Sequence, residues 1–165
     1  MARHGLPSIG QRNTGVSIAT EAGYEVVLPW GTESEKTRAR KIADGNTNAI
    51  VLERQNLTGI AREIAQCSGV IGVDTGLGHL AAALEKPTVS LYGPTNPGLS
   101  GTCGKNQLHL NSNLNCAPCV KKVCGYTGPG ISDNFSGKTF PVVPPCFSTH
   151  QPAAVWQKFT ELVNS

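Results

Sequence analysis

A chain of 165 residues is long enough to bury one core of α/β size and short for two. Hydrophobic residues make up 39% of it and charged residues 15%, with a net charge of +3, which excludes disorder throughout. The 14 Lys and Arg residues are scattered and only 5% of residues are aromatic, so no nucleic-acid partner is expected. No apolar stretch approaches the ~18 residues of a membrane span, and residues 1–18 lack the apolar core of a secretory signal, which favours a cytoplasmic protein.

Regular apolar patterns begin at about residue 19. We expect residues 1–18 to be irregular or non-native sequence, because Gly and Pro recur in them without an apolar period. The domain is therefore predicted to span residues 19–165. In chain order, the predicted elements are a helix end at 19–22, a strand at 24–28, a helix after Thr32, a strand at 48–53, a helix after Asn56, a strand at 69–73, a helix at 76–85 and a strand at 88–91.

The regular pattern fades after residue 98 and returns in one last helix at about 152–163. The segment at about 111–150 is expected to be a loop-rich insertion, and it carries four of the six cysteines. Strands and helices alternate before it. This alternation predicts an α/β fold with a Rossmann-like parallel sheet and helices on both faces.

The turn Asp74-Thr75-Gly76 joins a short apolar strand to a helix that carries His79 in its first turn. The first amides of a helix have no intrahelical partner and lie at the positive end of its dipole, so they can bind a phosphate. The alternative is a plain capped helix start, in which the Asp or Thr side chain accepts those amides. Both interpretations stay open from this turn alone.

The spacing Gly76-x-Gly78-x-x-Ala81 also fits the fingerprint of dinucleotide-binding domains, so an oxidoreductase domain is a further alternative. Against it, residues 92–96 hold no Asp or Glu where that fingerprint expects a ribose-binding acid. A phosphate loop of the nucleotide-hydrolase type is excluded, because the spacing from Gly98 to Lys105 is one residue too long and Asn106 follows.

The flanking sequence carries a family resemblance. Residues 74–84 followed by 87–95, together with 28–31 and 104–107, resemble the lipopolysaccharide heptosyltransferases of glycosyltransferase family 9, specifically the heptosyltransferase I type. The likeness runs from about residue 23 to residue 110. It implies the C-terminal, donor-binding half of a GT-B enzyme, in which two Rossmann-like domains face a cleft.

The resemblance implies an ADP-heptose donor and a Kdo-lipid A acceptor, reached by peripheral association with the cytosolic face of the inner membrane. It implies that Asp74 accepts hydrogen bonds from donor heptose hydroxyls. Thr75 and the amide of Gly76 would hold the diphosphate, and His79 would face the same phosphates. No cofactor is required for this transfer.

The resemblance also places Glu35 at the adenosine part of the donor and Gln55 at the adenine pocket. For Glu35 the alternative is a charge that stabilises a helix N-terminus. The catalytic base is expected in an N-terminal domain that this sequence does not contain, so no catalytic residue is assigned in this chain. We therefore expect the chain to bind donor and transfer little alone, as a truncated reading frame or a non-catalytic nucleotide-sugar-binding remnant.

Four cysteines in the loop-rich segment have a spacing compatible with a structural zinc site: Cys116, Cys119, Cys124 and Cys146. The alternative is that these are reduced cytosolic thiols, because the second half of the pattern lacks a C-x-x-C. A small metal-stabilised interaction domain is thus a third function for the chain. Cys67 and Cys103 are interpreted as ordinary small residues.

Overall fold

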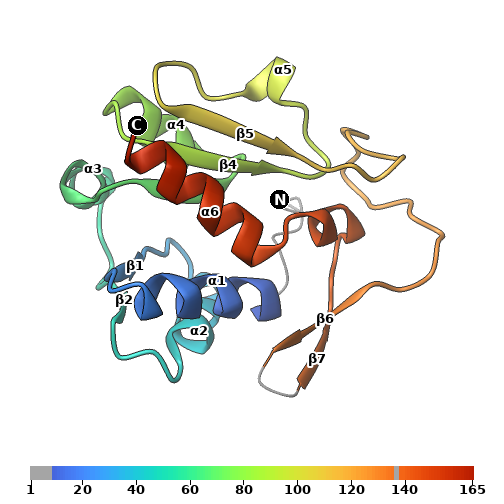
Figure 1. Cartoon of the computed structure of the whole chain (residues 1–165), viewed down its shortest axis with the longest axis horizontal. Coiled ribbons are helices and arrows are strands. Elements are labelled where there is room, and N and C mark those ends of the chain that lie inside the picture. The colour runs from blue at the N-terminus through green and yellow to red at the C-terminus, as the bar shows by residue number, and fades with distance from the viewer. Residues whose placement is uncertain (1–8, 136–137) are drawn as a thin grey trace.

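The computed structural model describes residues 9–135 and 138–165, arranged as Figure 1 shows. Among these residues, none of the helices combines the length and the apolar composition that crossing a membrane requires. The helices are α1 (Ile9–Glu21), α2 (Glu33–Ala43), α3 (Leu57–Gln66), α4 (Gly76–Ala83), α5 (Pro97–Ser100), the 3-10 helix η1 (Pro145–Thr149) and α6 (Pro152–Val163). The strands are β1 (Val26–Leu28), β2 (Ala49–Val51), β3 (Val70–Val73), β4 (Thr88–Tyr92), β5 (Gln107–Asn111), β6 (Ser132–Phe135) and β7 (Lys138–Pro141).

A first parallel ladder joins β1 to β2, with Val26 opposite Ala49. Between these strands, α2 begins at Thr32, whose hydroxyl accepts the backbone N–H of Glu35, while the Glu35 carboxylate accepts the N–H of Thr32. This capping box satisfies amides that have no intrahelical partner, and so fixes where the helix begins. Helix α1 packs against α2 and also against α6 (Figure 1).

A second parallel ladder has the order β3-β4-β5, with β4 in its centre. Successive side chains of a strand point to opposite faces. Ser90 faces α4, where Gly78 lies close to it, whereas Val89 packs against Val155 and Phe159 of α6. Helices therefore cover both faces of this ladder, as the sequence predicts. Because α6 covers Val89, this side chain is 0% exposed.

The N-terminal segment corrects one prediction. Residues 9–18, expected to be irregular, belong to α1, while residues 1–8 of the same prediction lie outside the described residues. Local sequence gives little sign of this helix, because Gly15 and polar residues interrupt any apolar stripe. Packing stabilises it instead, since Val16 and Ala19 are buried and most helical stability in proteins comes from such tertiary contacts.

The C-terminal half holds more regular structure than the sequence predicts. Strand β5 lies where no element was expected, and the segment at 111–150 contains an antiparallel hairpin, β6–β7, and η1. Strand β5 has only two apolar residues, which is too few for a clear alternating signal. The described strands also form two separate parallel ladders, β1–β2 and β3–β5, where one sheet was expected. Residues 112–131 hold no helix or strand, in agreement with the loop-rich prediction.

A buried histidine links η1 to the sheet. His150 is 7% exposed, and its Nε2–H donates to the carbonyl of Tyr92 at 3.0 Å. Burial lowers the pKa of His150 from its ordinary value of 6.5, so below pH 6.5 the unfolded chain binds more protons than the folded one. We expect the contribution of His150 to the free energy of unfolding to have its full value above pH 6.5 and to decrease as the pH falls below 6.5. The decrease is at most about 1.4 kcal/mol per pH unit.

Urea unfolding at a series of pH values between neutral and mildly acidic measures this dependence. The His150→Asn variant keeps a donor and should show a shallower slope, whatever its absolute stability. A matched variant, Leu99→Ala, removes an exposed side chain that does not titrate, and it should keep the parent slope. Equal slopes for the parent and His150→Asn would contradict the prediction.

Candidate functional site

The Asp74-Thr75-Gly76 turn lies at the carboxyl end of β3, where α4 begins. Thr75 is the N-cap of α4, and its carbonyl accepts the amides of Gly78 and His79 at 3.0 and 3.4 Å. Its hydroxyl makes no capping hydrogen bond, so the plain capped start considered from the sequence does not apply to Thr75. Gly76 is exposed, and nothing lies within 4 Å of the place where a Cβ would stand. The start of α4 is therefore uncovered at Gly76.

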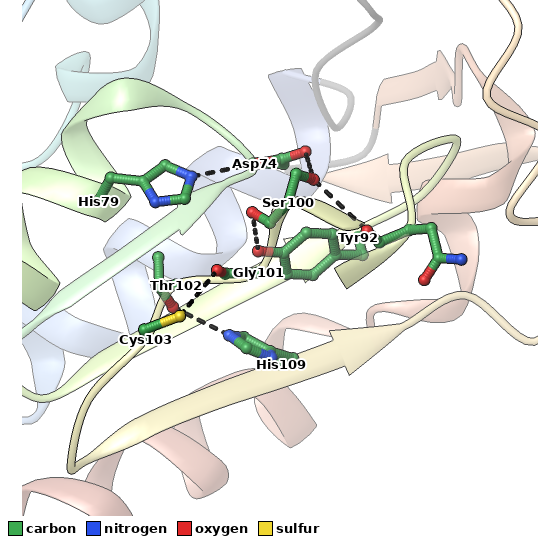
Figure 2. Close-up of polar contacts among 9 residues, drawn as sticks. Asp74, His79, Tyr92, Ser100, Gly101, Thr102, Cys103 and His109 are labelled. Carbon is green, nitrogen blue, oxygen red and sulfur yellow. Dashed lines mark hydrogen bonds and ion pairs between the residues drawn. The ribbon is translucent and has the colours of Figure 1, made fainter. Parts of the chain in front are cut away.

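Asp74 is held by two neighbours, as Figure 2 shows. Its Oδ2 accepts the Ser100 hydroxyl at 2.7 Å, and its Oδ1 lies 3.8 Å from Nε2 of His79. The Asp74 side chain is 15% exposed and that of His79 is 47% exposed. The carboxylate is thus fixed on its protein side, while the imidazole stands open to solvent beside the helix N-terminus.

Ser100 and Tyr92 are site residues that the sequence did not reveal. Asn96 caps α5 by accepting the amide of Gly98 at 2.9 Å, and this short helix brings Ser100 to Asp74. Tyr92 is buried at the end of β4, and its hydroxyl donates to the carbonyl of Ser100 at 3.5 Å (Figure 2). Burial raises the pKa of Tyr92, and the charge of Asp74 raises it further, so the phenol stays a neutral donor.

Glu35 lies in the first turn of α2, which follows β1, and Gln55 lies in the loop that follows β2. The Glu35 carboxylate accepts the amides of Gly31 and Thr32 at 3.0 and 2.9 Å, which is the helix-start role considered as the alternative. Gln55 is exposed and immediately precedes the cap of α3. Both follow the carboxyl end of a parallel strand, as Asp74 does, and ligands of α/β folds bind at such ends.

The cysteine segment surrounds a cavity of about 300 Å³, which all four of the predicted ligands line. They are Cys116, Cys119, Cys124 and Cys146. In the described part of the chain, no three His, Cys, Asp or Glu side chains already stand where they could hold a metal ion together. The zinc site therefore stays a prediction, with its candidate ligands gathered in one place.

Parallel strands with helices on both faces, and an Asp–His pair at the start of a helix after the third strand, define an α/β domain suited to a phosphate-bearing ligand. Comparison of the sequence with known protein families shows to which family this domain belongs. The chain belongs to glycosyltransferase family 9 (heptosyltransferase), whose family model matches residues 16–128.

Relatives of known name agree with this family. Lipopolysaccharide heptosyltransferase 1 of Pseudomonas aeruginosa is 54% identical over 106 residues, which are 64% of this chain and 30% of the relative. Lipopolysaccharide heptosyltransferase 1 of Escherichia coli K12 is 44% identical over 114 residues, which are 66% of this chain and 36% of the relative. The chain therefore spans about a third of the length of the curated relatives it matches.

Two solved structures of the E. coli heptosyltransferase WaaC are similar to this fold. The structure with ADP superposes with a TM-score of 0.60 at 40% identity and covers 61% of this chain and 32% of WaaC. The structure with ADP-2-deoxy-2-fluoro heptose gives a TM-score of 0.59 at 36% identity and covers 63% of this chain and 31% of WaaC. At these identities the likeness includes sequence as well as fold.

Proposed function

We propose that this chain forms the donor-binding part of a heptosyltransferase that transfers heptose from ADP-heptose to the Kdo of lipid A at the cytosolic face of the inner membrane. The observation that carries the proposal is the exposed start of α4, with its exposed Gly76, its non-capping Thr75 hydroxyl and the Asp74–His79 pair. Membership of family 9 and the solved relative with a fluorinated ADP-heptose support it.

In this proposal the diphosphate lies at the N-terminus of α4. The Gly76 amide and the Thr75 hydroxyl donate to phosphate oxygens, and His79 adds a third donor from the exposed side. Asp74 accepts from sugar hydroxyls instead, because a carboxylate placed against a phosphate would repel it. The Ser100 hydroxyl donates a hydrogen bond to Oδ2 of that carboxylate. Oδ1, on the His79 side, is therefore the oxygen presented to the sugar.

During transfer, the acceptor hydroxyl oxygen bonds to the anomeric carbon while the bond from that carbon to the β-phosphate oxygen breaks. Negative charge then grows on the departing ADP. Donors already oriented at the start of α4 stabilise this charge more strongly in the transition state than in the bound donor. The proton of the acceptor hydroxyl passes to a base in the other domain, which the family resemblance assigns to the N-terminal half.

Calorimetric titration of the purified chain with ADP-heptose, ADP and NAD tests the donor site. We expect Asp74→Asn to weaken ADP-heptose binding by about 10- to 100-fold, the loss typical of a hydrogen bond to a charged group, and to change ADP binding much less. His79→Gln should weaken the binding of both ADP-heptose and ADP, because His79 is placed at the diphosphate, which the two ligands share. Asp44→Asn, an exposed Asp at the end of α2, is the matched control and should bind as the parent does.

Equal weakening of ADP and ADP-heptose by Asp74→Asn would overturn the assignment of that residue to the sugar. A chain that prefers NAD would favour the dinucleotide alternative, and a chain that binds none of the three ligands would reject the donor site. Heptose transfer after adding the separately produced N-terminal domain of the Pseudomonas aeruginosa relative would distinguish a working donor half from a binding remnant.

A further inference from the structure

Four cysteines from two distant segments line one cavity that the donor site does not use. Cys116, Cys119 and Cys124 come from the coil between β5 and β6, and Cys146 comes from η1. All four are free thiols, and no disulfide joins them in the described part of the chain. Four thiols converging on a cavity of about 300 Å³ are a feature that core packing alone does not require.

One of the four cysteines is buried in the core, and the other three lie on coil. Cys146 is 6% exposed and packs with Val142 and Phe147, so its sulfur is anchored in the core beside Gly93. The three remaining cysteines lie on coil without helix or strand, two of them exposed. A backbone hydrogen bond from Val120 to the carbonyl of Pro94, at 2.8 Å, holds this coil against the loop after β4. The coil is thus held beside this loop, with its three cysteines in the lining of the same cavity as Cys146.

The charged side chains in the cavity lining, Lys121 and Lys122, suit a zinc–thiolate group. A bound Zn²⁺ replaces the four thiol protons and is held by four thiolates. Four thiolates and Zn²⁺ leave a net charge of −2, and Lys121 and Lys122 in the same lining offset it.

We propose that Cys116, Cys119, Cys124 and Cys146 bind one zinc ion, which fastens the coil of residues 112–131 to the core beside the loop after β4. Because no three of these groups stand in metal-binding positions yet, the coil cysteines must move inward until each sulfur lies about 2.3 Å from the ion. Four thiol protons pass to solvent in the process, and no electron transfer is involved. This site is independent of the donor site.

The test uses the full chain, stripped of metal with a chelator under reducing conditions and then titrated with Zn²⁺ alone or Co²⁺ alone. We expect about one Zn²⁺ per chain, and with Co²⁺ the thiolate-to-metal charge-transfer absorption of a tetrahedral sulfur site. Zinc should raise the melting temperature, because it binds the folded chain. Cys116→Ser and Cys124→Ser replace exposed residues, so they should fold and lose both the stoichiometric binding and the absorption band.

Cys103→Ser is the matched control, because Cys103 is also exposed but lies outside the cavity, and it should bind as the parent does. Zinc binding far below one ion per chain would overturn the proposal, as would full binding by Cys116→Ser or Cys124→Ser. A thiol count on the denatured, unreduced chain that falls short of six would instead show a disulfide, and would also overturn it.

Discussion

Replacing Phe159 by Ala is expected to lower the free energy of unfolding by about 3–5 kcal/mol, the range for a large aromatic side chain removed from a core. Phe159 is 5% exposed and packs on Val89 of the central strand. Its ring also stacks on Trp156 with centroids 5.3 Å apart, and lies 6.4 Å from that of Tyr24. The substitution leaves a cavity between β4 and α6. The strand and the helix cannot move together to close it, because backbone hydrogen bonds hold each of them in place.

Urea unfolding of Phe159→Ala beside the parent measures this loss. Leu99→Ala removes an apolar side chain that is 79% exposed, and it should change the free energy of unfolding by less than about 0.5 kcal/mol. If both variants lost the same amount, α6 would not be the cover of β4 that the fold requires.

Replacing Gly101 by Ala is expected to cost about 1–3 kcal/mol of stability and to weaken binding of ADP-heptose. The backbone of Gly101, at φ −67° and ψ 146°, is one that any residue adopts, so the obstacle is space. A Cβ there would meet the carbonyl oxygen of Pro97 and would stand 2.8 Å from Cε1 of His109. Relieving the clash moves the end of α5, and with it the Ser100 hydroxyl that holds Asp74 (Figure 2).

Urea unfolding and calorimetric titration with ADP-heptose together measure the two effects of Gly101→Ala. Gly130→Ala is the matched control, because nothing lies within 4 Å of its Cβ position, and it should leave both quantities unchanged. Parent-like stability together with parent-like affinity in Gly101→Ala would contradict the close packing of the α5 turn.

The elements that sequence predicts well are those whose local signals and tertiary roles agree. The stripe of Ile60 and Ile64 in α3 packs against Ala81 of α4, and the last helix spans 152–163 as expected. Strand β5 and the part of α1 at residues 9–18 escape prediction for the opposite reason. Their own residues give weak patterns, and contacts with distant elements, α6 for the helix and β4 for the strand, decide their structure.

The same division applies to the candidate site. The turn from Asp74 to His79 is predictable, because the strand, turn and helix that form it are consecutive in sequence. The bond between Ser100 and Asp74 is not, because it joins residues 26 positions apart through the fold of a four-residue helix. For Glu35, the sequence offered a donor contact and a helix-start role, and the structure shows the second in the bonds from Gly31 and Thr32.

The cover of the central strand has a consequence for how the chain reaches its folded state. Val89 becomes buried only when Val155 and Phe159 arrive from the far end of the sequence, and α1 also docks on that last helix. Contacts between such distant segments carry a large loop-closure cost and slow the folding of a domain. Until α6 is in place, one apolar face of β4 stays open, so a chain that has not yet formed α6 is prone to aggregation at this face.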